Sequence, residues 1–137
     1  MLYELGTSTS TFNTQINCTD IIASGKVTCV SLIQTSDKRI KENIVDADLV
    51  QIQSVFDKVD VKMYNRTDIE GSRIGFIAQD FVNTLPGEFS NIAIETYHTG
   101  NPLWGLDYFR LTTILWSVCK QQQKQIDDLT ARMGPYI

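Results

Sequence analysis

The spacing of hydrophobic residues is clearest in the last third of the chain, where it predicts one long α-helix over 107–133. Asp107 can cap the start of this helix, and Gly134-Pro135 can end it. At ~1.5 Å per residue the helix is roughly 40 Å long. One series of its residues recurs at steps of three and four: Leu111, Leu115, Val118, Gln122, Ile126, Leu129 and Met133. This spacing is typical of a coiled-coil seam with one stutter, so we expect the helix to pair with copies of itself.

The middle of the same helix is polar. The segment 121–125 reads Gln-Gln-Gln-Lys-Gln, which is too polar for the core of a monomer. At a seam position, Gln122 would fix the register of the paired helices at some cost in stability. The alternative is an ordinary helix with a frayed end, in which Gln122 has no special role.

The middle of the chain predicts short helices and a small antiparallel sheet, so the fold class is α+β. Acidic residues at 46–48 can cap a helix whose apolar residues have helical spacing: Leu49, Ile52, Val55 and Phe56. Strands are predicted over 59–64, 73–78 and 91–96. A polar loop containing Gly71 joins the first two strands, and a short helix over 79–85 stops at Pro86-Gly87.

Residues 1–35 differ in character from the rest of the chain. They are rich in Thr, Ser and Asn, and short β-prone segments are predicted at 14–18, 20–23 and 26–33. Too few large apolar residues are present for a separate core. We therefore expect this β-rich segment to pack against the following domain or against copies of itself, with the domain boundary at Ser36.

Composition narrows the classes of partner. Hydrophobic residues make up 42% of the chain, which permits a packed core, and the net charge of -4 argues against a nucleic-acid partner. No apolar run approaches the roughly 20 residues that span a bilayer, so no membrane segment is expected within this chain. Cys18, Cys29 and Cys119 lack metal-ligand spacing and are expected to be small buried residues. With His98 as the single histidine, neither a metal site, a cofactor nor a His-based triad is expected.

Three blocks of sequence occur in an order that carries a resemblance. They are SDKRIKENI at 36–44, GFIAQDF at 75–81 followed by Pro86, and LDYFRL at 106–111. Together they resemble the intramolecular chaperone domains behind phage tailspike endosialidases and neck appendages, which form peptidase family S74. The family also includes the self-releasing segment of myelin regulatory factors. The resemblance covers Ser36 to about Met133.

The resemblance implies that the two parts of the chain have different functions. Residues 1–35 would be the end of a fibre or stalk, and 36–137 an auto-processing chaperone domain with its coiled-coil helix at 107–133. Such domains form a homotrimer, hold three chains in register while the upstream fibre of the same chain folds, and then cut themselves off. Here the cut would fall at Ser36-Asp37. The protein would be a virion component assembled in the host cytoplasm, with the domain released after assembly.

The resemblance also implies a Ser–Lys dyad of Ser36 and Lys41. A serine hydroxyl needs a base, and lysine can replace histidine in that role. Asp37 would orient the junction or accept backbone donors, and Asn43 and Gln79 are candidate donors to the oxyanion. The structural alternatives are a helix cap for Asp37 and a turn residue for Asn43.

Lysine must lose its proton to act as this base. Its ordinary pKa is about 10.4, so the neutral form is scarce at neutral pH. Burial among apolar residues such as Ile40, Ile44 and Ile77 would favour that form. We expect such a dry site only in an assembled trimer, which would link cutting to assembly.

The residues around Ser36 do not determine which peptide bond breaks. Attack of Ser36 on the preceding carbonyl forms a five-membered ring and breaks the chain before Ser36. Attack on its own carbonyl needs a strained four-membered ring. Cleavage after Ser36 therefore requires a serine of another subunit, a water activated by Lys41, or help from Asp37.

Three other functions fit the same residues. A non-cleaving trimerisation module would use the fold only to set register. The release segment of a membrane-tethered transcription factor would need a DNA-binding domain upstream and a membrane span downstream, and neither is predicted within this chain. A receptor-binding fibre tip would keep the domain as its knob.

Overall fold

The computed structural model describes residues 11–98 and 100–134. The chain divides into two units, Met1–Ser36 and Asp37–Ile137. Within residues 11–36 of the first unit there is no helix or strand, and every side chain is exposed. The strands predicted at 14–18, 20–23 and 26–33 are therefore not formed in the single chain. An extended segment becomes a strand only when a neighbour satisfies its backbone donors and acceptors. The predicted stalk residues 1–10 lie outside the described residues.

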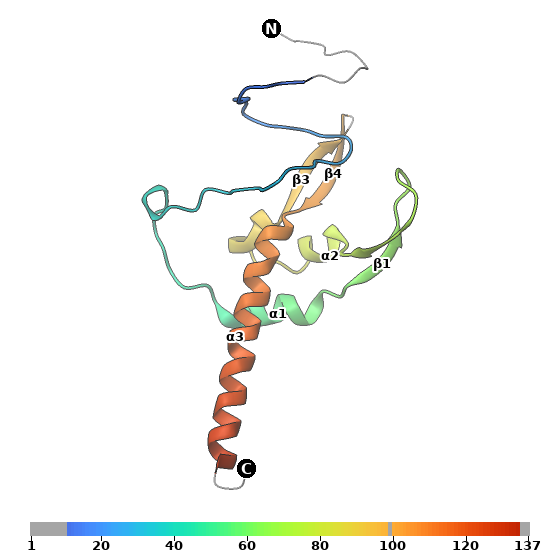
Figure 1. Cartoon of the computed structure of the whole chain (residues 1–137). Helices are drawn as coiled ribbons and strands as arrows, with labels where there is room; N and C mark the ends of the chain where they lie inside the picture. Colours follow the sequence, from blue (N-terminus) through green and yellow to red (C-terminus); the bar gives the residue numbers. More distant parts are fainter. Residues whose placement is uncertain (1–10, 99, 135–137) are drawn as a thin grey trace. The chain divides into compact units, whose positions relative to one another are not determined.

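The second unit is α+β, as predicted (Figure 1). It starts with the 3₁₀-helix η1 (Lys38–Ile40), helix α1 (Leu49–Lys58) and a hairpin of β1 (Lys62–Asn65) and β2 (Ser72–Gly75). Next come helix α2 (Ala78–Val82), the 3₁₀-helix η2 (Gly87–Ile92) and a hairpin of β3 (Ala93–His98) and β4 (Asn101–Leu106). The last element is helix α3 (Tyr108–Met133).

The strands form two separate two-stranded antiparallel sheets rather than the single small sheet expected. In the first sheet Lys62 is paired with Gly75, and in the second Ala93 is paired with Leu106. Strand β4 was not predicted, because Pro102 and Gly105 are residues that weaken a strand. Its pairing with β3 outweighs that local preference.

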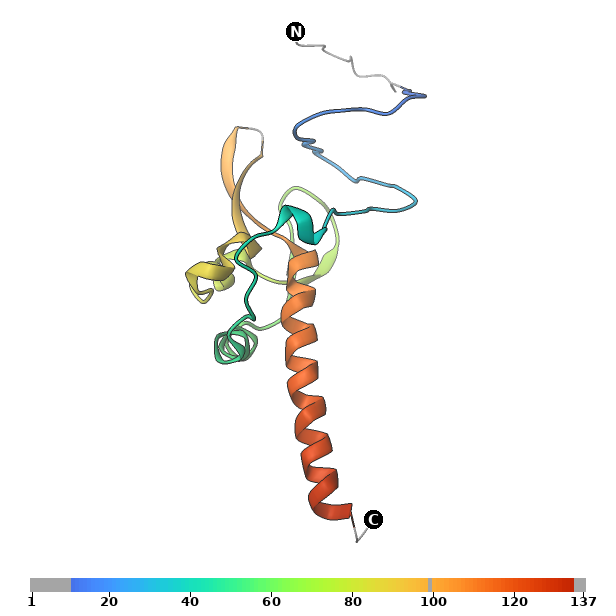
Figure 2. The same cartoon turned by 90° about the vertical axis from the view of Figure 1, so that its left-hand side faces the viewer.

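Eight buried hydrophobic residues form the core of the second unit: Ile52, Val55, Phe81, Ile92, Ala93, Leu111, Ile114 and Val118. Helix α1 lies beside the first half of α3 in both views (Figures 1 and 2). The side chains of Val55 and Val118, one from each helix, are only 1% and 2% exposed. The start of α3 is fixed to the preceding layer by the Asp107 backbone N–H, which donates to the carbonyl of Ile92 at 2.8 Å. The core therefore joins α1, α2, η2, β3 and the first half of α3.

The second half of α3 continues beyond α1 (Figures 1 and 2). Its apolar side chains remain in solvent, with Ile126 and Leu129 both 55% exposed and Met133 56% exposed. By contrast, Leu111 and Val118 of the predicted seam are buried in the chain's own core. These two residues stabilise the fold of the single chain, and the first exposed residue of the predicted seam is Leu115, which is 53% exposed.

The three cysteines are free and exposed, which corrects the prediction that they are buried. Cys18 and Cys29 lie in the first unit, where no described side chain is buried, and Cys119 lies on the solvent side of α3 beside buried Val118. Among the described residues, none of the helices is long and apolar enough to cross a membrane.

Candidate functional site

The predicted cleavage junction coincides with the boundary between the two units. Ser36 is the last residue of the first unit and is exposed, and Asp37 is the first residue of the second. Asp37 has extended backbone angles of φ -66° and ψ 138° and caps η1, the turn that follows. The structure thus places a short ordered turn immediately after the proposed cut.

Arg39 binds the carboxylate of Asp37 through both of its oxygens. The Arg39 backbone N–H donates to Oδ1 at 2.8 Å, its Nε donates to Oδ1 at 3.0 Å, and its Nη2 donates to Oδ2 at 2.7 Å. These hydrogen bonds from Arg39, together with the charge of Lys41, lower the pKa of the Asp37 carboxyl below its usual value of 3.8. The same contact raises the pKa of the Arg39 guanidinium. Asp37 is therefore a carboxylate at neutral pH.

Lys41 follows directly after η1. Its backbone N–H donates to the carbonyl of Lys38 at 3.1 Å and closes the turn, and its side chain is exposed. Ile40 and Ile44 were expected to surround it, but they are 69% and 61% exposed. The single chain does not supply the expected dry environment, because its core lies among α1, α2 and α3.

Asn43 and Gln79 lie in different settings. Asn43 is exposed and has a left-handed φ of 52°, a conformation in which Asn is favoured over most other residues with a Cβ. Gln79 is exposed on α2 and lines a pocket of about 310 Å³ with residues from β1 and β4, such as Tyr64 and Trp104. Among the described residues, none of those lining this pocket comes from the segment 36–44. The left-handed backbone at position 43 is enough to explain why Asn stands there. Gln79 lies on a surface that does not include the segment 36–44.

Arg39 is the residue at the junction whose contact with Asp37 was not predicted. The spacing offered a signal, because an Arg two residues after an Asp can return to its carboxylate across a tight turn. The same spacing in the reverse order, Arg before Asp, produces a second pair in the loop between β1 and β2. There Arg66 donates to Asp68 through Nε at 2.7 Å and Nη2 at 2.6 Å.

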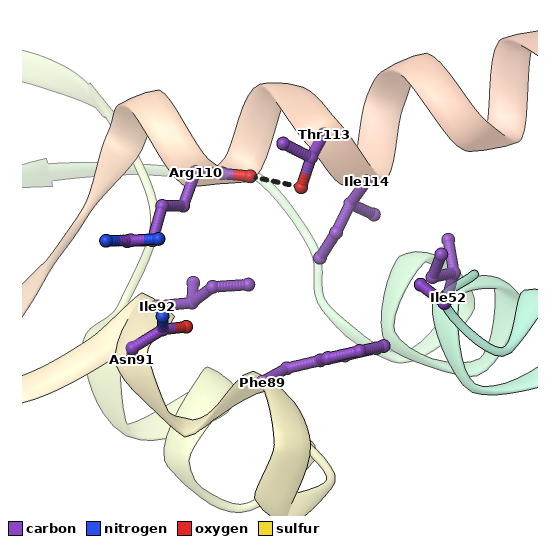
Figure 3. A pocket seen from close by; sticks show the side chains of 8 residues that line it. Ile52, Phe89, Asn91, Ile92, Arg110, Thr113 and Ile114 are labelled. Carbon is purple, nitrogen blue, oxygen red and sulfur yellow. Dashed lines mark hydrogen bonds between the residues drawn. The ribbon is translucent and has the colours of Figure 1, made fainter. Parts of the chain in front are cut away.

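A small pocket of about 140 Å³ lies between α1, η2 and α3 (Figure 3). Its lining is largely apolar, with Ile52 and Ile114 on facing helices (Figure 3). The Thr113 hydroxyl donates to the Arg110 carbonyl at 2.7 Å, and Arg110 Nε donates to the Asp107 carboxylate at 2.9 Å. These polar groups of the pocket are thus bonded to the first turns of α3 and its cap. We interpret the pocket as a gap in the packing and not as a binding site.

A larger apolar groove of about 480 Å³ opens between the end of α1, α2 and α3. Its lining includes the partly exposed side chains of Phe56, Val61 and Leu115, which are 41%, 57% and 53% exposed. Trp116, the neighbour of Leu115 on α3, is 73% exposed. Partly exposed apolar side chains grouped around one groove, as Phe56, Val61 and Leu115 are, are typical of a surface that another chain covers.

Residues 36–89 match the family model Peptidase_S74, described as chaperone of endosialidase. The match confirms the resemblance over the first two sequence blocks and begins at Ser36, the last residue of the first unit. The third block, 106–111, lies outside the matched range. No curated protein matches the chain.

Proposed function

Since residues 36–89 match the Peptidase_S74 family model, we propose that the second unit is an intramolecular chaperone for a viral fibre or tailspike. It trimerises, sets the register of the upstream stalk, and releases itself by autoproteolysis at Ser36-Asp37. One observation carries the proposal: the family match begins at Ser36, where the unit without strands or helices among its described residues meets the folded one. In this proposal the protein is a virion component assembled in the host cytoplasm.

Ser36 is the proposed nucleophile and Lys41 the proposed base. The base must be neutral, and burial favours neutral lysine. Because Lys41 and its neighbour Ile40 are exposed in the single chain, we assign their burial to the neighbouring copies in the trimer. Cleavage then waits for assembly, which prevents release from an unregistered fibre.

Cleavage at the junction breaks the bond between the Ser36 carbonyl carbon and the Asp37 nitrogen. Water supplies hydroxyl to the new carboxyl terminus and a proton to the new amino terminus. A fragment that begins at Asp37 follows from water activated by Lys41 or from a serine of another subunit. A fragment that begins at Ser36 follows from attack of its hydroxyl on the Thr35 carbonyl, which breaks the Thr35–Ser36 amide bond and forms an ester, and from hydrolysis of that ester by water. Intact mass distinguishes a fragment that begins at Asp37 from one that begins at Ser36.

Self-association is assigned to α3 beyond the core. Leu115, Ile126 and Leu129 are each more than half exposed, and they follow one another at coiled-coil spacing through Gln122. Gln122 would fix the register of three parallel helices. Leu111 and Val118 contribute by stabilising the head from which the helix extends.

The test is intact mass of the purified chain, compared among wild type, Ser36→Ala and Lys41→Ala. We expect wild type to yield the released fragment and both variants to remain whole, because each lacks one member of the dyad. Lys38→Ala is the matched control, since Lys38 is also basic and lies on the same turn. Cleavage that persists in Ser36→Ala or Lys41→Ala would refute the dyad.

A non-cleaving trimerisation module is the second candidate. It is favoured by the exposure of Lys41 together with the apolar second half of α3. A wild-type chain that sediments as a trimer and keeps its full mass would establish this function in place of the first.

A further inference from the structure

The carboxylate of Asp37 belongs to the residue whose nitrogen is freed in the proposed cut. Both of its oxygens accept hydrogen bonds from Arg39, at distances of 2.7–3.0 Å. The pair lies on the surface, with the Arg39 side chain 88% exposed and that of Asp37 46% exposed. Its stabilising effect on the fold is therefore small, and its position beside the junction suggests a role in cleavage.

We infer that Arg39 is a positioning residue for the proposed cleavage, which holds the Asp37 carboxylate out of the reaction and fixes the residue after the cut. The inference rests on the proposed function. It assigns a role to a residue outside the dyad and selects among the routes by which the junction could break.

The competing route uses Asp37 itself. An aspartate oxygen can attack the carbonyl carbon of the preceding residue through a six-membered ring and expel its own amine. Water would then hydrolyse the mixed anhydride, which would complete the break between Ser36 and Asp37 without the dyad. That attack needs a carboxylate oxygen free to turn toward the Ser36 carbonyl. Arg39 binds both oxygens and turns them toward its own backbone and guanidinium, on the η1 side of Asp37. We call this contact, in which Arg39 binds both oxygens of Asp37, the Arg39–Asp37 fork. The fork therefore suppresses the aspartate route.

The same contact between Arg39 and Asp37 helps to hold the short turn that joins the cut to the proposed base. Its backbone hydrogen bond caps η1, and the Ile40 N–H donates to the Asp37 carbonyl at 3.3 Å. The turn is closed at Lys41, whose N–H donates to the Lys38 carbonyl at 3.1 Å. Asp37 and Lys41 thus begin and end one hydrogen-bonded turn. A reacting group displaced by about 1 Å can lose on the order of 100-fold in rate.

Charge supports this assignment. The hydrogen bonds of Arg39 lower the pKa of the Asp37 carboxyl below its usual value, and the carboxyl holds no proton at neutral pH. It therefore has none to give to the leaving amine. The proton exchanged in cleavage is assigned to Lys41 instead.

The experiment compares cleavage rates of the full chain among wild type, Arg39→Ala, Asp37→Ala and the double variant. We expect Arg39→Ala to slow cleavage on the order of ten- to a hundred-fold. The double variant should lose no more than either single variant, because the two side chains act as one unit. Arg66→Ala is the matched control, since it breaks the equivalent Arg66–Asp68 fork in another loop. Its cleavage rate should equal that of wild type.

Asp37→Asn gives a second readout, because Asn keeps the capping oxygen and removes the charge. It should still cleave, and its pH–rate profile should follow that of wild type, since Lys41 exchanges the proton. An unchanged cleavage rate in Arg39→Ala, or complete loss of cleavage in Asp37→Asn, would overturn the inference and leave the proposed function standing. A wild-type chain that never cleaves would overturn both.

Discussion

We expect the first half of α3 to stabilise the fold of the single chain and the second half to mediate self-association. One pair of substitutions tests these two roles separately. Val118 lies in the core and is 2% exposed, whereas Leu129 is 55% exposed. Val118→Ala removes two methyl groups from a packed site and leaves a cavity, which costs about 2–3 kcal/mol of unfolding free energy. Leu129→Ala removes a side chain that solvent already reaches, so the unfolding free energy of a monomer should change by less than about 0.5 kcal/mol.

The effect of Leu129→Ala should instead appear in self-association. Full burial of a leucine contributes about 1.5–3 kcal/mol. Since the Leu129 side chain is 55% exposed, assembly gains roughly half of that, about 1 kcal/mol per chain. Three chains give about 3 kcal/mol, or about two orders of magnitude in the trimer dissociation constant.

Both substitutions are made in the Ser36→Ala background, which keeps the chain whole. Urea denaturation at a concentration where the protein is monomeric measures the fold, and sedimentation equilibrium over a dilution series measures assembly. The reasoning is refuted if Leu129→Ala destabilises the monomer as much as Val118→Ala does. It is equally refuted if Leu129→Ala leaves association unchanged, or if the parent chain is monomeric throughout.

Two further predictions concern local packing and capping. Gly75→Ala would place a Cβ 2.9 Å from the Tyr64 hydroxyl and 3.0 Å from that of Tyr108, so it should lower the unfolding free energy by about 1–3 kcal/mol; an unchanged urea midpoint would contradict the close approach. Asp107→Ala removes the α3 cap, which accepts from the Arg110 backbone N–H at 3.0 Å and from its Nε at 2.9 Å. It should cost about 1 kcal/mol in the same assay, and a neutral result would show that the cap is not needed.

The helices could be predicted because their signals are local. Asp48 and Asp107 cap α1 and α3 as the sequence indicated, and the periodic residues between the ends of each helix follow one face. The first hairpin was also predictable, since Gly71 at φ 102° provides the turn that its loop needs. Strand β4 escaped because its residues are poor strand formers, and the pairing that stabilises it is a property of the tertiary fold.

Spacing alone could not predict whether a given apolar residue of α3 packs on the chain's own core or remains exposed. Steps of three and four produce one apolar stripe whether the stripe packs on the chain's own core or on another copy. Leu111 and Val118 take the first role, and Ile126 and Leu129 remain for the second. The surroundings of Lys41 were likewise out of reach, because nearby isoleucines in the sequence do not determine which way a turn exposes them.

The left-handed backbone at Asn43 bears on how this position can change in evolution. Glycine adopts that conformation without strain and Asn or Asp at modest cost, whereas β-branched residues are excluded. Selection for shape would therefore admit Gly, Asn and Asp among relatives that still cleave. Selection for an amide that binds the oxyanion would retain Asn alone. Variation at this one position distinguishes a residue kept for its backbone from one kept for its chemistry.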